Sequence, residues 1–269
     1  MSDRVLVSFS DGIADVRFNR ADKRNALDGD MFLAIAEVGE RLKTEPGVRA
    51  VVLSGEGPSF CAGLDFSSFQ AMAGGDDAQT ERRGNPGHIA EGRITHLGQQ
   101  VCWVWQEVPV PVIAAVHGHA LGGGLQIALG ADIRIVHPDA QLSVREVHWG
   151  LVPDMTGTFV LSRLVRPDVA RELTYTARMI SGTEALQLGL ATRLSEDPRA
   201  DAMTLAGEIA ARSPGAVRGS KELFNRMFTE GAADQFAAER SVIGAQIGTA
   251  NQIEAVMANM EKRAANFAD

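Results

Sequence analysis

The chain has 269 residues, of which 45% are hydrophobic and 22% are charged, and its net charge is −8 at neutral pH. This length allows one large domain or a domain with a helical appendage, and the acidic balance argues against a broad nucleic-acid-binding surface. No window approaches the roughly 18 consecutive apolar residues of a membrane span, and residues 1–7 show no signal peptide pattern. We therefore expect a soluble, cytoplasmic protein that uses neither nucleic acid nor membrane.

The first half of the chain alternates strand and helix patterns. Apolar and polar residues alternate over 4–18 around Asp11-Gly12, which predicts a hairpin. Helical spacing over 28–43 begins with Asp28 as N-cap, and 49–53 has the pattern of a buried strand. Residues 73–87 show no periodicity and are expected to lie over a site.

Further elements follow in the same alternation and then give way to helices. We predict a helix over 88–107, a strand over 108–116, a buried helix from about Gly123 and a strand over 132–136. Ala-rich helical patterns then cover 199–212, 214–229, 233–248 and 250–265. We expect an α/β core over 1–198 and a helical region over 199–269.

Two glycine-containing loops, 60–65 and 120–126, each follow an apolar strand and precede a predicted helix. Unpaired backbone N–H groups at such positions stabilise negative charge, and two converging ones form an oxyanion hole. The alternative is structural, because glycine also permits a tight turn or close packing of a helix on a strand. Spacing alone leaves both interpretations open.

Two acids, Glu146 and Asp154, lie in one segment that Gly150 and Pro153 interrupt, so a bent path can direct both into one pocket. The apolar residues around them predict raised pKa values and proton transfer. In the alternative interpretation Glu146 pairs with Arg145 or Arg134, and Asp154 caps a helix that begins at Met155. Cys61 and Cys102 form no disulfide framework, and no ligand spacing predicts a metal site.

Four separated segments resemble the crotonase (enoyl-CoA hydratase/isomerase) family, and the likeness covers nearly the whole chain. They are Phe18–Leu27, Ser59–Asp65, Val112–Gly124 and Glu261–Phe267. The resemblance implies a crotonase-like spiral of ββα units with a C-terminal helical region for trimerisation, which also completes the coenzyme A site. It further implies a homotrimer or homohexamer and an acyl-CoA thioester substrate. No cofactor is expected, because coenzyme A is part of the substrate.

The same resemblance assigns roles to individual residues. The thioester oxygen is expected to accept hydrogen bonds from the backbone N–H groups of Leu64 and Gly123, while Glu146 and Asp154 move protons. Expected substrate or coenzyme A contacts are Lys23, Arg24, Ala26, Ala62, Asp65, Gln126 and Lys262. For the basic residues, an ordinary role as solvated surface charges stays equally open.

Gln126 decides the expected reaction. Hydratases of this family use two glutamates, one just after the triple glycine, and here that position is Gln126, whose amide does not exchange a proton usefully. Glu146 and Asp154 instead resemble the acid spacing of dienoyl-CoA isomerases, so we expect isomerisation of an enoyl-CoA or dienoyl-CoA. The alternatives are a hydratase that uses Glu146 with Asp154, or a noncatalytic homologue that binds acyl-CoA. No nucleophilic serine with a placed histidine and aspartate supports a peptidase.

Overall fold

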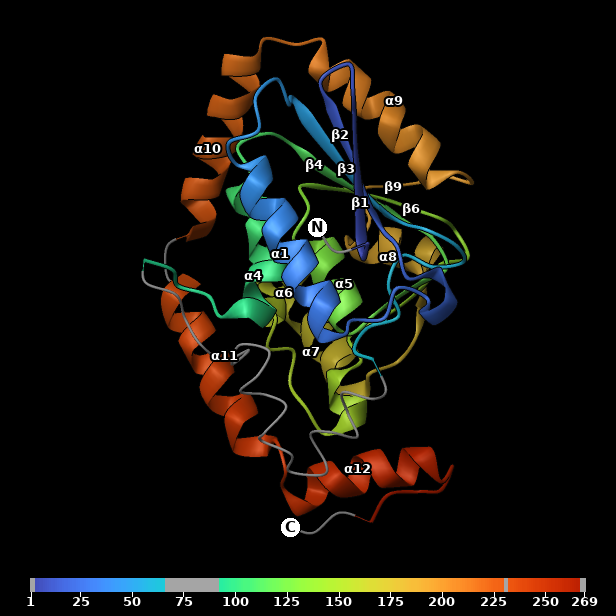
Figure 1. Ribbon diagram of the computed structural model, residues 1–269. Coiled ribbons are helices and arrows are strands. Elements are labelled where there is room, and N and C mark those ends of the chain that lie inside the picture. Colours follow the sequence, from blue (N-terminus) through green and yellow to red (C-terminus); the bar gives the residue numbers. More distant parts are fainter. Residues whose placement is uncertain (1–2, 66–91, 230–231, 267–269) are drawn as a thin grey trace.

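The computed structural model describes residues 3–65, 92–229 and 232–266, and its main sheet has six strands. An antiparallel hairpin of β1 (Val5–Ser10) and β2 (Ile13–Phe18) forms one edge, as the sequence predicted. Asp11 and Gly12 turn the chain with positive φ angles of 50° and 80°. The sheet continues in parallel through β3 (Ala50–Gly55), β4 (Val112–Val116), β6 (Ile133–Val136) and β9 (Arg193–Leu194) (Figure 1).

A second, smaller sheet runs beside the first and gives the chain its spiral course. It contains β5 (His119–Leu121), β7 (Gln141–Ser143) and β8 (Ile180–Ser181) in the order β5-β7-β8. Strand β4 of the main sheet leads directly to β5 of the small sheet and then to helix α5 (Gly123–Leu129), and β6 leads likewise to β7. The turns of the chain that contain β4 and β6 thus each add one strand to each sheet.

Helices α1 (Gly29–Leu42) and α4 (Leu97–Glu107) pack together beside the main sheet (Figure 1). Asp28 caps α1 as predicted, because its carboxylate accepts a hydrogen bond from Met31 N. The prediction for the second helix is wrong at its start, since α4 begins after the N-cap His96 and not at residue 88. Residues 66–91, which include the patternless segment 73–87, lie outside the described part of the chain.

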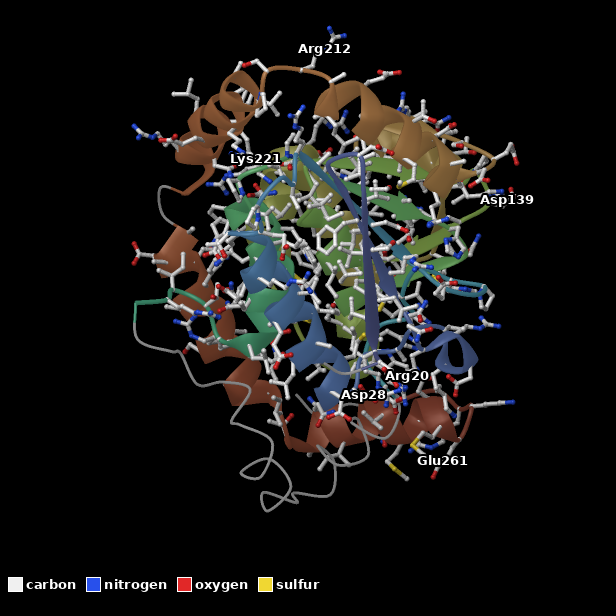
Figure 2. The ribbon with its side chains drawn as sticks, turned by 45° about the horizontal axis from the view of Figure 1, so that its top comes forward. Arg20, Asp28, Asp139, Arg212, Lys221 and Glu261 are labelled. Atoms are coloured by element: carbon white, nitrogen blue, oxygen red, sulfur yellow. The ribbon has the colours of Figure 1, made fainter. Side chains whose placement is uncertain are left out.

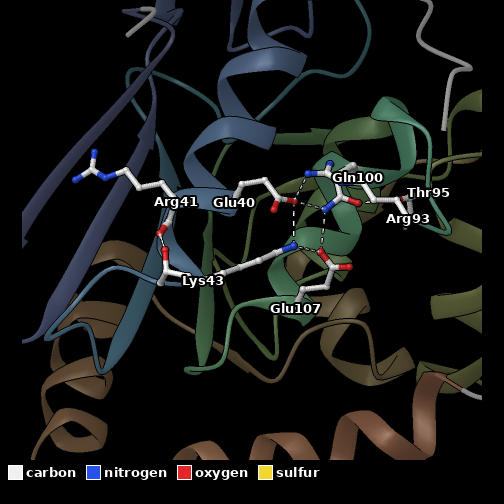
Figure 3. A network of polar contacts seen from close by, with 8 residues as sticks. Glu40, Arg41, Lys43, Arg93, Thr95, Gln100 and Glu107 are labelled. Carbon is white, nitrogen blue, oxygen red and sulfur yellow. Dashed lines mark hydrogen bonds and ion pairs between the residues drawn. The ribbon is translucent and has the colours of Figure 1, made fainter. Parts of the chain in front are cut away.

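Figure 3 shows the polar network that joins these two helices. Lys43, the C-cap of α1, donates from Nζ to Glu40 at 2.9 Å and also contacts Glu107 of α4. Gln100 Nε2 donates to Glu40 at 2.8 Å and to Glu107 at 2.9 Å. The network fixes α4 against α1 at the protein surface, while the apolar faces of both helices enter the core.

The core lies on both faces of the main sheet. Its larger part fills the space between the sheet and helices α1, α4 and α5. The other face is covered by α9 (Pro198–Ala210), whose small residues Ala202, Ala206 and Ala210 pack against Val52 and Ile113. Because alanine lets a helix approach a sheet closely, α9 can lie flat along this face (Figure 1).

The remaining helices surround the core and extend beyond it. They are η1 (Ala21–Lys23), α6 (Gly157–Leu164), α7 (Pro167–Thr176), α8 (Gly182–Leu188), α10 (Pro214–Thr229), α11 (Ala232–Gln246) and α12 (Ala250–Met260). The end predicted for α12 is wrong, because the helix stops at Met260 and Lys262 then has φ 55°. No helix in the described ranges is long and apolar enough to cross a bilayer.

Two anchors hold α10 and α11 to the core. Lys221 of α10, labelled in Figure 2, donates to the carbonyl oxygen of Trp105 at 2.8 Å and to Asp132 at 2.8 Å. On α11, Phe236 packs edge-to-face against Trp103 of α4 and Phe159 of α6. These contacts place α11 beside α6 and the segment before it, which connects η2 (Glu146–Trp149) to α6 and contains Asp154.

Candidate active site

The two glycine loops meet at one point of the fold. Cys61 N donates to His119 O at 2.9 Å, and Leu121 N donates to Cys61 O at 3.1 Å, so the first loop extends the small sheet beside β5. Gly63 has φ 89°, and a Cβ atom there would lie 2.6 Å from Leu121 O. Only glycine permits this close approach, which brings the first loop against the second.

The N–H groups of Leu64 and Gly123 lie at this meeting point. Leu64 forms a parallel β-bridge with Leu27. The two hydrogen bonds of the bridge are made by the residues on either side of Leu64, because Leu27 N donates to Gly63 O and Asp65 N donates to Leu27 O. In such a parallel bridge the N–H of Leu64 points away from Leu27. Gly123 is the first residue of α5, so its N–H has no partner within the helix. Among the described residues nothing accepts a hydrogen bond from either group.

Glu146 begins the 3-10 helix η2 (Glu146–Trp149) and turns inward, with only 8% of its surface exposed. Its Oε1 accepts a hydrogen bond from Gln126 Nε2 at 2.5 Å. A Cβ atom on Gly122, which has φ 50°, would lie 3.2 Å from the same oxygen, so the carboxyl group lies directly against the second loop. Its Oε2 is buried and has no hydrogen-bond partner in the described part of the chain.

This environment changes the chemistry of Glu146. Burial raises the pKa of Glu146 to about 7, and the nearby Asp154 charge acts in the same direction. The two ion pairs considered from the sequence do not form, since Arg134 donates to the carbonyl oxygens of Leu190 and Ala131. Arg145 likewise donates to a backbone oxygen. Glu146 can therefore gain and lose a proton near neutral pH.

Gln126 connects the two predicted acids. Its Oε1 accepts a hydrogen bond from Met155 N at 3.0 Å, which fixes the orientation of the amide because an N–H cannot donate to Nε2. The Nε2 group must then donate to Glu146. One amide thus holds the Glu146 carboxyl and the backbone next to Asp154 in a single arrangement.

Asp154 lies half-buried on the segment between η2 and α6. The alternative interpretation, in which Asp154 caps a helix that begins at Met155, is wrong, because α6 begins at Gly157 and its N-cap is Thr156, which makes no side-chain cap. Burial raises the pKa of Asp154 to about 7, and the charge of Glu239 adds to the effect. Burial together with the charges of Asp154, Glu239 and Glu146 also raises the pKa of the Cys102 thiol, which places these carboxyl groups around one point.

Lys23, Arg24 and Ala26, which we call the basic corner, lie at the end of η1 next to the first loop. Lys23 and Arg24 are exposed, and Ala62 N of the first loop donates to Arg24 O at 2.9 Å. The Arg24 guanidinium donates to His119 Nε2 at 3.3 Å. Because arginine cannot accept a hydrogen bond, His119 must carry its own proton on Nδ1, which lies 2.9 Å from Ser59 Oγ. The Arg24 side chain is thus oriented along the edge of the two loops.

The other two predicted contacts have different surroundings. The Asp65 carboxylate is buried and accepts a hydrogen bond from Arg20 Nη1 at 2.5 Å. The Nε atom of Arg20 also lies 3.5 Å from Asp28 Oδ2 (Figure 2). Lys262 is exposed just beyond α12. That helix lies against η2 of the same chain through a contact of Asn259 with His148.

Sequence reasoning missed two residues of α11 near the site. Ile243 packs against Leu151, with Leu64 and Trp149 beside them, so an apolar wall from the C-terminal region lies next to the first loop. Glu239 is buried near Asp154. Neither residue belongs to a motif, and an Ala-rich helix gives no signal of what it covers. In the described ranges no group of histidine, cysteine or acidic residues is arranged to hold a metal ion.

Comparison with known proteins gives a consistent result over the whole fold. The model of the family described as enoyl-CoA hydratase/isomerase matches residues 8–269. Among solved structures, an enoyl-CoA hydratase/isomerase from Pseudoalteromonas atlantica superposes with a TM-score of 0.85 at 29% identity, covering 98% of this chain and 100% of that one.

Curated relatives carry the names of two different reactions. A crotonyl-CoA hydratase of Syntrophomonas wolfei is 31% identical over 98% of this chain and 98% of its own length. A mitochondrial Delta(3,5)-Delta(2,4)-dienoyl-CoA isomerase of Mus musculus is also 31% identical, over 93% of this chain and 77% of its own length. Hydratase names are the more frequent among the relatives, but identity alone does not separate the two reactions.

Proposed function

Because the chain belongs to the enoyl-CoA hydratase/isomerase family, we propose that it is an acyl-CoA isomerase that moves a double bond in an enoyl-CoA or dienoyl-CoA. The observation that carries this proposal is the hydrogen-bonded position of Gln126. An amide stands where hydratases of the family are expected to have a glutamate, and its bonds to Glu146 and Met155 leave it no role as an acid. The groups left to move protons are Glu146 and Asp154.

The proposed reaction begins with removal of a proton from carbon. Glu146 takes this proton on Oε2, the oxygen without a partner, and the electron pair moves through the acyl chain onto the thioester oxygen. The N–H groups of Leu64 and Gly123 bond the resulting oxyanion, with each donor contributing on the order of 3 kcal/mol to its stabilisation. Asp154 then returns a proton farther along the chain, and the double bond forms at its new place.

The pKa values of Glu146 and Asp154 support a proton shuttle between these acids. Both have pKa values raised to about 7, so at neutral pH one can act as a base while the other holds a proton. Since substrate and product are isomers, the proposed step needs no oxidant, reductant or water. Coenzyme A enters as part of the substrate, and we expect no separate cofactor.

Hydration of a 2-enoyl-CoA is the second candidate function. It is favoured by the hydratase names of most relatives, such as the crotonyl-CoA hydratase of Syntrophomonas wolfei. In this case Glu146 and Asp154 would activate a water molecule. Neither reaction would occur in a noncatalytic acyl-CoA-binding homologue, so product analysis separates all three.

The test is incubation with 2-enoyl-, 3-enoyl- and 3,5-dienoyl-CoA in deuterated water, followed by mass spectrometry and NMR of the products. We expect a shifted double bond, deuterium at carbon and no mass gain from added water. A 3-hydroxyacyl-CoA as the main product would replace the isomerase proposal with the hydratase. Tight binding without any product would leave only the binding function.

The assembly is part of the same proposal. We propose a homotrimer or homohexamer, supported by Leu223 and Phe224 of α10, which expose 66% and 65% of their surface in the single chain. Light scattering after gel filtration tests this, and a monomer at micromolar concentration would contradict it. We also propose that the reaction takes place in the cytoplasm, which cell fractionation tests.

A further inference from the structure

A third acid, Glu239 of α11, is buried next to the proposed site but has no part in the proposed reaction. Only 4% of its surface is exposed. Its Oε2 accepts hydrogen bonds from Thr156 N at 3.0 Å and from Gln99 Nε2 at 3.3 Å. Its Oε1 accepts from Thr158 Oγ1 at 2.5 Å. The carboxyl group therefore ties α11 to the turn that follows Asp154.

That turn has a backbone conformation that threonine rarely adopts. Thr156 has φ 68°, in the left-handed region, which is unfavourable for a β-branched residue. It is fully buried, and its Oγ1 has no hydrogen-bond partner in the described part of the chain. Such a conformation persists only where its surroundings hold it. The bond from Thr156 N to Glu239 does so on one side, and the bond from Val160 N to Thr156 O does so on the other.

The backbone around Asp154 is thus held from two sides. Gln126 bonds Met155 N, and Glu239 bonds Thr156 N one residue later. Since Asp154 directly precedes these residues, their orientation sets the direction of its carboxyl group. The Gln126 contact connects this segment to Glu146, and the Glu239 contact connects it to the C-terminal helices.

The charged and titratable groups around Asp154 come from several elements. Glu146 of η2, Cys102 of α4 and Glu239 of α11 interact electrostatically with Asp154, and the charge of Glu239 raises the pKa of Asp154 in addition to burial. Arg240 reaches Glu239 through an amide, because it donates to Gln99 Oε1 while Gln99 Nε2 donates to Glu239.

One further titratable group lies on this side of the site. His96, the N-cap of α4, has its pKa lowered to about 4 by burial and by the charge of Arg240. It is therefore neutral at pH 7 and contributes no charge to the surroundings of Asp154 under assay conditions.

We propose that Glu239 is a positioning residue, which holds the Asp154 carboxyl in its working direction by fixing the Thr156 turn. This inference rests on the proposed function, in which Asp154 returns a proton to the acyl chain. It adds a role for α11, a helix far from the two loops in sequence. Because α11 carries this contact, the arrangement of one catalytic acid depends on the C-terminal region.

Glu239→Ala and Glu239→Gln separate the two effects of this residue. In Glu239→Ala the turn loses its acceptor, and we expect kcat to fall at least about 10-fold with KM changed by less than about twofold. Glu239→Gln keeps an oxygen that can accept from Thr156 N but removes the charge. We expect it to restore most of kcat, while the high-pH limb of the rate profile moves to lower pH because Asp154 then loses its proton more easily.

The matched control is Asp234→Asn, which removes the same charge from an exposed position of the same helix. It should leave both kcat and the pH profile as in the wild type. Wild-type kcat in Glu239→Ala, or an unshifted limb in Glu239→Gln, would overturn the proposal. Should Glu239→Ala not fold, Thr158→Val removes one bond to Glu239 and is expected to lower kcat about threefold, and unchanged kcat would count against the proposal.

Asp154→Asn, measured in parallel, distinguishes this inference from the proposed function. If Asp154→Asn keeps wild-type turnover, the proposed role of Asp154 fails and the positioning role fails with it. If Asp154→Asn is inactive while the Glu239 variants behave as the wild type, only the positioning role fails. Thermal unfolding of every variant, at the pH of each assay, separates loss of rate from loss of folded protein.

Discussion

The proposed site has two ends with opposite physical settings, the acid pair Glu146 and Asp154 and the basic corner around Arg24. Glu146 is buried, bonded through one oxygen and unpaired at the other. Arg24 is exposed, and its guanidinium contacts a neutral His119. Both ends adjoin the two glycine loops, but the charged group is buried at one end and exposed to solvent at the other.

The difference shows how environment decides what a charged residue can do. Burial moves the pKa of each acid to about 7, so the acids can exchange protons at neutral pH. An arginine in water stays fully charged, and its attraction for an anionic ligand is screened by salt. Changes at the acid pair should therefore alter turnover, whereas changes at the basic corner should alter binding.

The largest effect is expected from Glu146→Gln. The amide keeps the size of the side chain and can still accept from Gln126, but it cannot remove a proton. We expect kcat to fall by about two to four powers of ten, while the dissociation constant for an acyl-CoA changes by less than about twofold. Steady-state kinetics and calorimetric titration measure the two quantities.

Glu208→Gln serves as the control, because this glutamate is exposed on α9, on the far face of the main sheet from α5. It should retain wild-type kinetics. If Glu146→Gln turned over at the wild-type rate, Glu146 would have no part in the mechanism. The expectation that changes at the acid pair alter turnover would then be wrong for Glu146.

The same burial predicts a cost in stability that depends on pH. The pKa of Glu146 is about 7 when folded, above the ordinary 4.5 of an unfolded chain, so between these values the folded state binds more protons. Its free energy of unfolding must then fall as the pH rises from 5 to 8. Glu146→Gln lacks this titration. Relative to wild type, its free energy of unfolding should therefore increase by up to about 3 kcal/mol between pH 5 and pH 8.

Urea unfolding of wild type and Glu146→Gln at pH 5 and at pH 8 measures the gain. An equal difference between the two proteins at both pH values would mean that Glu146 titrates as an ordinary exposed acid. Arg212→Ala, which changes an exposed arginine that contacts neither acid, should show no such dependence on pH in this range.

Local signals explain what the sequence predicted correctly. The Asp11-Gly12 hairpin, the Asp28 cap and the start of α5 at Gly123 are fixed by residues within a few positions of one another. The start of α4 was misplaced because His96 supplies the cap, and histidine is not among the usual N-cap residues. The strained Thr156 was not foreseen for a similar reason, since nothing in its own sequence favours a positive φ.

Within the site, motifs located the two loops and the acids but not the contacts between them. The bonds of Gln126 to Glu146 and Met155 join three parts of the chain, and the bond from Thr156 to Glu239 brings in a fourth. These contacts depend on how helices pack, which periodicity does not specify. The roles of the basic corner and of Lys262 stay predictions, because exposure does not distinguish a binding residue from a surface charge.

Gln126→Glu adds a third carboxyl group beside the acid pair, and so tests whether the residue at position 126 selects the reaction. One oxygen can still accept from Met155 N, and the other would then share a proton with Glu146, because two carboxylates so close cannot both be ionised. This supplies the second glutamate expected of a hydratase. We expect hydration of a 2-enoyl-CoA to rise about tenfold and isomerisation to fall about tenfold.

Product ratios in ¹⁸O-labelled water measure this change of reaction. The exposed Gln187→Glu on α8 adds the same charge away from the acids and should leave the ratio as in the wild type. An unchanged ratio in Gln126→Glu would show that the residue at position 126 does not determine which reaction occurs. The position of Gln126 would then no longer support the isomerase proposal.

The smallest effect is expected at the exposed end, from Arg24→Ala. Loss of one solvent-exposed cation should raise KM for an acyl-CoA about three- to tenfold at low salt, leave kcat unchanged and shrink to near nothing at about 1 M salt. Arg212→Ala removes the same charge at the end of the molecule opposite to Arg20 (Figure 2) and should change neither quantity. If the two variants behave alike, Arg24 is a surface charge and the nucleotide is held elsewhere. If Arg24→Ala lowers kcat, the two ends are coupled, because a residue that only binds the nucleotide cannot change the rate of proton transfer once the substrate is saturating.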